Sequence, residues 1–200
     1  MSSRLGPSAQ AHGVALSRDC AGRLARYAQL LLAWNRQINL TGARSAEALV
    51  DDHLADALAL VPRIPPGARR LVDVGAGAGL PGVILAVVCQ GLDVTLLEPV
   101  QKKHAFLATV RRELGLEGLH PIRQRWQEHL SDEMFQAYDV AVSRATWPLS
   151  TWLEVGLRLV RSGGLVLGLE GREPISLPRA AIRFPYRLGA RARAVVCLPN

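Results

Sequence analysis

The sequence predicts an α/β protein built around a mainly parallel sheet, and three observations support this. From residue 69 onward, short apolar runs alternate with amphipathic segments, as in sheets whose parallel strands are connected by helices on both faces. A glycine-rich turn follows the first apolar run, within the segment LVDVGAGAGLPG. Two β-like stretches near the end of the chain, joined through Gly189, indicate an antiparallel hairpin that brings the sheet to seven strands.

The apolar runs also place the individual elements. The period-2 and continuous apolar runs predict strands at 69–74, 93–98, 119–123, 138–143 and 164–169, and a hairpin at 182–187 and 192–198. Helical periodicity predicts helices at 81–90, 101–115, 126–133 and 149–161. Gly115 is expected to end the second of these helices, and the segment from Arg161 to Gly164 to turn into the fifth strand.

The chain before this pattern, residues 1–66, is expected to be a helical extension to a domain of residues 67–200. Residues 1–15 are small and polar, so we expect them to be frayed. Apolar residues at helical spacing predict one helix at about 18–35 and another at about 45–61. Prolines and a glycine then form a short linker.

Charge and cysteine content limit the possible classes of function. The 200 residues carry a net charge of +7, which makes nucleic acid a plausible partner. The three cysteines lie far apart without C-x-x-C spacing, so neither a disulfide scaffold nor a zinc site is expected, and a reducing cytoplasm fits. No uninterrupted apolar stretch is long enough for a membrane span. The order of serine, histidine and acid expected of a hydrolase is missing from the sequence, as is a G-x-S-x-G turn.

Acidic residues close the first two expected strands. Asp73 ends the first and is followed by glycines at every second position, Gly75, Gly77 and Gly79, and Glu98 ends the second. Such acids beside a glycine-rich turn are how α/β sheets hold a nucleoside-bearing cofactor. We therefore predict a cofactor site where these two strands end.

The glycine spacing favours S-adenosylmethionine as that cofactor. A dinucleotide motif G-x-G-x-x-G counted from Gly75 would need glycine where Leu80 stands. Counted from Gly77, the same motif does place Gly82 correctly, so a nicotinamide dinucleotide stays as the weaker alternative. S-adenosylmethionine has no pyrophosphate for a helix N-terminus to bind.

The two acids have a functional and a structural interpretation each. Asp73 either receives the ammonium group of the cofactor or only braces the turn. The two oxygens of Glu98 match the two ribose hydroxyls, or else Lys102 or Lys103 neutralises this strand-end acid.

Further candidates follow the third and fourth expected strands. Trp126 and Gln127 could form an apolar wall and a hydrogen-bonding edge for adenine, although Trp126 is equally compatible with a core position. Arg144 ends an apolar strand and needs an anionic partner when it is buried. The candidate partners are a cofactor carboxylate, Asp73 and an RNA phosphate. The alternative is a solvated side chain. His53 lies near Asp52 and Asp56 without a further ligand cluster, so we expect a hydrogen bond to the Asn39 region instead of a metal.

The chain resembles the 16S ribosomal RNA guanine-N7 methyltransferases, historically called glucose-inhibited division protein B. The resemblance covers residues 34–171 and rests on Trp34-Asn35, Asn39-Leu40-Thr41, His53 and Asp56, Asp73 to Gly82, Thr95 to Glu98, Lys102-Lys103, Phe106-Leu107, Arg125 and Ser143-Arg144-Ala145. It implies a Rossmann-like class I methyltransferase fold and S-adenosylmethionine as the cofactor. It also implies N7 methylation of one guanosine in the decoding region of 16S ribosomal RNA. The family's cofactor contacts fall on Gly75, Leu80, Trp126, Gln127 and Arg144.

Three positions depart from the family pattern. Trp126-Gln127 replaces a small aliphatic residue and glutamate, Glu170 stands where lysine is usual, and Ala57 replaces serine. The alternatives are a class I methyltransferase with another substrate, and an RNA-binding relative with weakened catalysis.

The implied reaction needs no catalytic acid or base, because guanine N7 carries a free lone pair and no proton. We expect Arg125 and Arg144 to position the substrate or the cofactor carboxylate. Phosphate contacts are assigned to Lys102, Lys103, Arg111 and Arg112, of which the last two also fit a solvated helix face. The partner would be 16S ribosomal RNA or the small ribosomal subunit, with no metal or membrane, and the protein is expected to be a cytoplasmic monomer.

Overall fold

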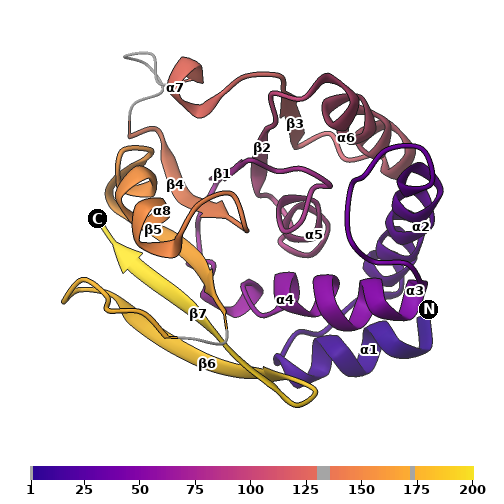
Figure 1. Ribbon diagram of the computed structural model, residues 1–200, viewed down its shortest axis with the longest axis horizontal. Coiled ribbons are helices and arrows are strands. Elements are labelled where there is room, and N and C mark those ends of the chain that lie inside the picture. The colour runs from indigo at the N-terminus through magenta and orange to yellow at the C-terminus, as the bar shows by residue number, and fades with distance from the viewer. Residues whose placement is uncertain (1, 130–135, 172–173) are drawn as a thin grey trace.

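A computed structural model describes residues 2–129, 136–171 and 174–200 (Figure 1). Its centre is a seven-stranded sheet in the order β3-β2-β1-β4-β5-β7-β6. The pairings among β1 to β5 are parallel, and β7 runs antiparallel to both β5 and β6. The strands are β1 (Arg70–Val74), β2 (Asp93–Leu97), β3 (Leu119–Ile122), β4 (Tyr138–Ser143), β5 (Val160–Glu170), β6 (Ile182–Leu188) and β7 (Arg191–Pro199). The predicted fold class is confirmed, including the terminal hairpin.

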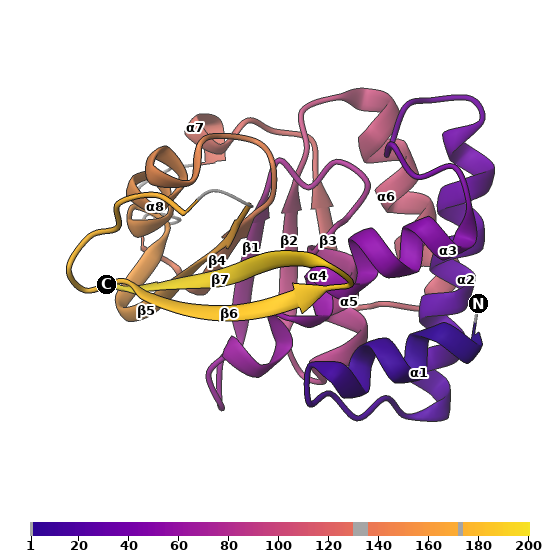
Figure 2. The same ribbon diagram turned by 60° about the horizontal axis from the view of Figure 1, so that its bottom comes forward.

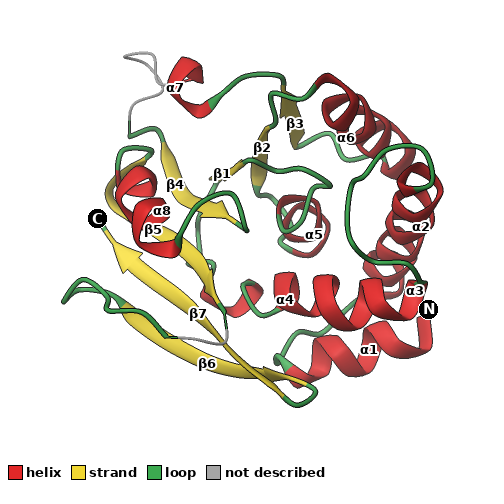
Figure 3. Ribbon diagram, in the orientation of Figure 1, coloured by secondary structure: helices red, strands yellow, loops and turns green. Residues whose placement is uncertain are grey.

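Helices cover both faces of the sheet (Figure 3). One face carries the larger hydrophobic cluster, formed with α1 (Ser2–Ala11), α2 (Arg18–Asn35), α4 (Ala55–Leu58), α5 (Gly82–Val88) and α6 (Gln101–Leu114). The other face carries a smaller cluster, formed with α7 (Trp126–His129) and α8 (Leu149–Leu157). Successive strand residues alternate between the clusters: Leu71 joins the larger and Val72 the smaller. Gly115 ends α6 in the left-handed conformation, as the sequence predicts.

The N-terminal residues correct one prediction, because the expected frayed segment forms helix α1. Leu5 and Ala9 are fully buried in the larger cluster, four residues apart on one face of this helix. Gly6 and Pro7 are poor helix formers, so the sequence of this segment does not predict a helix. Packing against α2 and the segment at 49–58 stabilises α1 instead.

Two further elements differ from their expected form. The helix expected at 45–61 contains a short α-helix α3 (Ala46–Ala48), a π-helical segment η1 (Leu49–Leu54) and α4, and a 3-10 turn η2 (Val61–Arg63) follows. The expected turn before the fifth strand is an irregularity inside β5, where the pairing with β4 shifts register and Gly163 has a positive φ of 73°. The predicted helix at 126–133 begins as α7, and residues 130–133 of it lie outside the described residues.

The turn of the β6–β7 hairpin reaches the N-terminal helices, whereas the other end of the hairpin lies on the opposite side of the molecule (Figure 2). Arg191 at the start of β7 forms an ion pair with Asp52 of η1, and the hydroxyl of Tyr186 in β6 donates to Asp56 of α4 at 2.7 Å. In the described ranges, no helix combines the length and apolar character that a membrane span requires.

The burial of α1 leads to a first prediction. Leu5→Ala should lower the free energy of unfolding by about 2–4 kcal/mol, because it leaves a cavity in a packed cluster. Arg4→Ala is the matched control in the same helix, since its ion pair with Asp51 is half-exposed and worth about 0–1 kcal/mol. Urea denaturation of both variants provides the measurement. Equal, small effects would mean that α1 contributes little to the stability of the fold.

Candidate functional site

A cavity of about 590 Å³ opens where β1, β2 and β4 end. The sequence-predicted residues that line it are Gly75, Gly77, Leu80, Glu98, Lys103, Arg125, Trp126, Gln127 and Arg144. Two others, Asp73 and Gly79, do not line it and instead shape the turn behind its wall. The cavity lies at the carboxyl edge of the parallel strands, where open α/β sheets bind ligands.

The glycine-rich turn between β1 and α5 is tied to the end of β2. The amides of Gly75 and Ala76 both donate to the carbonyl of Leu97, at 2.9 and 3.0 Å. Gly75, Gly77 and Gly79 all have positive φ, a conformation that other residues rarely adopt. A side chain at Gly75 would also place its Cβ 2.4 Å from Thr146 Oγ1. The sequence pattern therefore corresponds to a real steric requirement.

Glu98 is held by backbone amides, and neither Lys102 nor Lys103 neutralises it in the described structure. One carboxylate oxygen accepts from Gly77 N at 2.9 Å and the other from Val100 N at 2.8 Å. The residue is only 3% exposed, yet it borders the cavity. Two amides thus fix an acceptor carboxylate at the wall.

Asp73 lies fully buried beneath the turn. Its Oδ2 accepts from Gly82 N at 2.8 Å, at the start of α5, whereas its Oδ1 has no hydrogen-bond partner. Burial raises the pKa of Asp73 to about 7, and the Gly82 amide and the charge of Arg144 only partly oppose this rise. A Cβ at residue 82 would lie 2.3 Å from Leu96 Cδ2 and 2.7 Å from Asp73 Oδ2, so only glycine fits there. The bracing interpretation of Asp73 thus agrees with its contacts, and one oxygen stays available.

Helix α2 supplies a contact to the turn that sequence reasoning missed. The hydroxyl of Tyr27 donates to the carbonyl of Ala78 at 2.6 Å, and its ring is fully buried beside Phe106. Tyr27 lies at helical spacing with the apolar residues of the helix expected at 18–35, and the only sequence signal of a further role is its hydroxyl, which needs a partner when buried. The N-terminal extension therefore helps to hold the candidate cofactor site.

The opposite wall comes from the segment after β3. Trp126 packs against the smaller hydrophobic cluster and also lines the cavity, so its role as a wall for adenine stays a prediction that its position allows. The guanidinium of Arg158 lies 5.7 Å from the centre of its ring. Arg125 and Gln127 line the cavity with exposed side chains.

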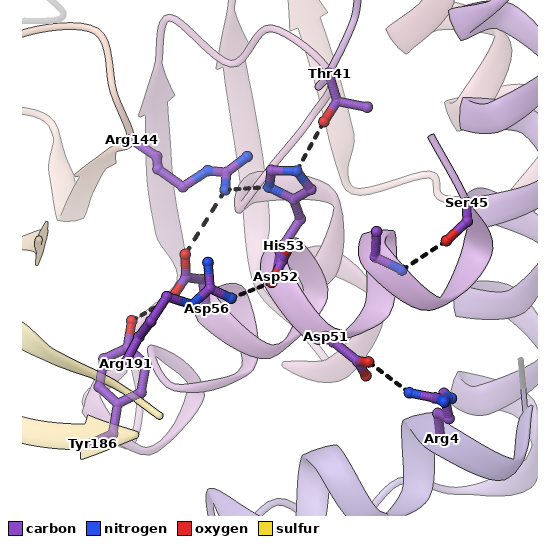
Figure 4. A network of polar contacts seen from close by, with 11 residues as sticks. Arg4, Thr41, Ser45, Asp51, Asp52, His53, Asp56, Arg144, Tyr186 and Arg191 are labelled. Atoms are coloured by element: carbon purple, nitrogen blue, oxygen red, sulfur yellow. Dashed lines mark hydrogen bonds and ion pairs between the residues drawn. The ribbon is translucent and has the colours of Figure 1, made fainter. Parts of the chain in front are cut away.

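Arg144 contacts His53 and Asp56, and not Asp73, which is the one candidate partner that the sequence suggests from within the chain (Figure 4). Its Nη1 donates to Nδ1 of His53 at 2.8 Å and lies 4.0 Å from Oδ2 of Asp56. Burial and the positive charge of Arg144 lower the pKa of His53, so the neutral ring accepts at Nδ1 and donates from Nε2 to Thr41 Oγ1 at 3.0 Å. The expected hydrogen bond of His53 to the Asn39 region is thus found at Thr41. No group of three metal-ligating side chains is found among the residues that the structure describes.

Glu170 does not present a free negative charge, although it stands where a lysine was expected. It is 4% exposed, and Arg183 binds it through two hydrogen bonds of 2.6 and 2.8 Å. The hydrogen bond from Arg183 holds the pKa of Glu170 below its usual range. Arg183 of β6 therefore neutralises the negative charge that Glu170 brings to the end of β5.

Comparison with solved structures agrees with this fold. An S-adenosylmethionine-dependent methyltransferase from Aquifex aeolicus aligns with a TM-score of 0.55 at 14% identity, over 75% of this chain and 92% of the other. A putative methyltransferase of the same cofactor class from Methanococcus maripaludis aligns with a TM-score of 0.58 at 13% identity, over 86% and 92% of the two chains. At such low identity these likenesses establish the fold alone.

Sequence comparison is more specific. A protein called ribosomal RNA small subunit methyltransferase G from Anaeromyxobacter dehalogenans is 43% identical over 166 residues, which cover 82% of this chain and 75% of the relative. One of the same name from Ralstonia nicotianae is 39% identical over 181 residues, covering 86% and 79%. The family model described as rRNA small subunit methyltransferase G matches residues 21–179. This chain, with the fold of an S-adenosylmethionine-dependent methyltransferase, therefore belongs to the rRNA small subunit methyltransferase G family.

Proposed function

We propose that this protein transfers a methyl group from S-adenosylmethionine to N7 of one guanosine in 16S ribosomal RNA. The observation that carries the proposal is the cavity in which the glycine-rich turn and Glu98 face Trp126 and Gln127, in a chain of this family. Its volume of about 590 Å³ lies in the range of small-molecule sites. RNA as the substrate also agrees with the net charge of +7.

The residues present fit this cofactor. Glu98 offers an amide-anchored carboxylate at the wall, as a vicinal diol requires. Asp73 supports the same wall from behind, because its Oδ2 accepts from Gly82 N at the start of α5 while the carboxyl group stays fully buried. We assign Gly75, Gly77, Leu80, Trp126, Gln127 and Arg144 to the walls of the same site, with Gly79 shaping the turn.

The chain's own contribution to the reaction is alignment. S-adenosylmethionine, when bound, supplies an electrophilic methyl group on a sulfonium sulfur. Guanine N7 has no proton to lose, so the protein needs no general base and instead orients the base and excludes water. Arg125, Arg144 and Lys103 are cations that line the cavity, and we assign the positioning of the substrate to the two arginines.

The partner would be the small ribosomal subunit or its naked RNA, encountered in the cytoplasm, with this protein acting as a monomer. Residues 1–66 would act as an extension that supports the turn through Tyr27, and residues 67–200 as the methyltransferase domain.

The proposed function is tested by incubating the protein with labelled S-adenosylmethionine and small-subunit RNA from cells that lack this gene. We expect label in 16S RNA, and chemical cleavage specific for N7-methylguanosine at one position. RNA from cells that retain the gene should accept little label. Label found only in protein or small molecules would support a methyltransferase with another substrate.

A second prediction concerns Glu98. Glu98→Gln should weaken binding of S-adenosylmethionine about 10-fold or more, because an amide can accept only one of the two backbone hydrogen bonds and carries no charge. Asp93→Asn is the matched control, since Asp93 begins the same strand at its opposite end and is exposed. Isothermal titration calorimetry gives both affinities. An unchanged affinity of the Glu98 variant would remove this residue from the cofactor site.

A third prediction concerns the buried Asp73. Because burial raises its pKa to about 7, the folded protein binds this proton more tightly than the unfolded chain does. The stability that results is complete below the ordinary aspartate pKa and is lost as the pH rises through about 7. Asp73→Asn removes this dependence, so the variant should gain stability relative to the parent between pH 5 and 8, by about 3 kcal/mol.

Urea denaturation of both ligand-free proteins across this pH range measures the difference. A constant offset at all pH values would show that Asp73 titrates normally in the fold.

A further inference from the structure

A second cavity, of about 380 Å³, adjoins the candidate cofactor cavity. The two share a wall of Arg144, Ala145 and Trp147, the segment that follows β4. Ala145 has a positive φ of 57°, which is uncommon for a residue other than glycine and is often found at functional sites. The remaining walls come from η1 and α4, α8, the end of β5 and the start of β7.

Trp147 gives this cavity a flat aromatic wall that is fixed in place. Its ring is parallel to that of Trp152, with centroids 6.0 Å apart and an angle of 9° between planes. Trp152 is 2% exposed, and its Nε1 donates to Leu167 O at 2.8 Å. A half-buried indole that rests on an immobile one is a ready surface on which a nucleobase can stack.

The polar groups of the second cavity carry both signs of charge. Asp56 contributes a carboxylate whose Oδ1 accepts from Tyr186 and whose Oδ2 lies on the side of Arg144 (Figure 4). Arg193 adds a cation at the start of β7, and Arg191 lines the cavity together with Asp52, its ion-pair partner. An anionic RNA is attracted by the cations, whereas the carboxylate needs a group that donates hydrogen bonds.

Among RNA bases, guanine has the donors that suit this carboxylate. Its N1–H and N2–H groups lie side by side on one edge, O6 comes next, and N7 lies on the far side of O6. Adenine instead presents an acceptor at N1, which a carboxylate repels. The order of groups around guanine matches the order along the wall, in which Asp56, then Arg144, then the cofactor cavity follow one another.

We propose that the second cavity binds the target guanine, stacked on Trp147, with Asp56 accepting from its N1–H and N2–H edge and Arg144 donating to O6. N7 then faces the cofactor cavity across the shared wall. This inference rests on the proposed function and adds the site and the residues that select the base. Such reading of a base, by stacking and by contacts to its Watson–Crick edge, is typical of enzymes that act on bases outside a helix.

The stacking part is tested by methyl-transfer kinetics with varied RNA concentration and saturating cofactor. Trp147→Ala should raise KM for RNA about 10-fold, the loss expected when one stacked base loses its aromatic partner, and Trp147→Phe should recover most of it. Arg187→Ala is the surface control, because Arg187 is an exposed residue of β6 that lines neither of the two cavities. Calorimetry of S-adenosylmethionine binding accompanies each variant, because Trp147 borders both cavities.

The base-selecting part is tested with nucleoside monophosphates as inhibitors against RNA, again with cofactor saturating. In the parent protein, guanosine monophosphate should inhibit more strongly than inosine monophosphate, which lacks the N2 amine, and adenosine monophosphate should inhibit least. Asp56→Asn keeps an oxygen for Tyr186 but replaces an acceptor with a donor, so it should abolish the preference for guanine. A merely structural role of Asp56 would leave that preference unchanged.

The outcomes separate this inference from the proposed function. Suppose that the parent protein methylates 16S RNA. The second cavity is then not the base site if Trp147→Ala leaves KM for RNA unchanged. The same conclusion follows if the three nucleotides inhibit alike, or fail to inhibit at millimolar concentration. If the parent binds S-adenosylmethionine but transfers no methyl group to any form of the RNA, the proposed function fails first.

Discussion

The glycine-rich turn keeps its shape because buried groups from other elements satisfy its polar backbone. The end of β2 accepts two of its amides through Leu97, Glu98 accepts a third from Gly77, and Tyr27 of α2 donates to the carbonyl of Ala78. Such buried backbone groups would be costly to leave unpaired. The cavity therefore depends on the packing of α2 against the sheet as much as on the three glycines.

Sequence reasoning succeeds where the determinants are local. The apolar runs of β1 and β2, the stop at Gly115 and the turn after Asp73 each depend on neighbouring residues, and the structure confirms them. It fails where distant packing decides. Helix α1 forms despite Gly6 and Pro7 because Leu5 enters a core built by other segments.

The candidate site shows the same division between local and distant determinants. The spacing of acids and glycines points to the cavity, because a parallel sheet brings consecutive strand ends to one edge. No sequence pattern pairs Arg144 with Asp56 and His53, since η1 and α4 meet the end of β4 only in the folded chain. The compensation of Glu170 by Arg183 likewise requires the hairpin to place β6 beside the end of β5.

The polar network around Arg144 explains how a half-buried cation can stand between two cavities. A guanidinium there would be costly without compensation, and a carboxylate in full bidentate contact would occupy two of its five N–H donors. Asp56 lies 4.0 Å away and the neutral His53 accepts a single hydrogen bond, so the charge is offset while other donors of Arg144 stay available. Because Thr41 and Tyr186 fix the positions of these partners, the N-terminal helices and the hairpin together orient Arg144 at the wall that both cavities share.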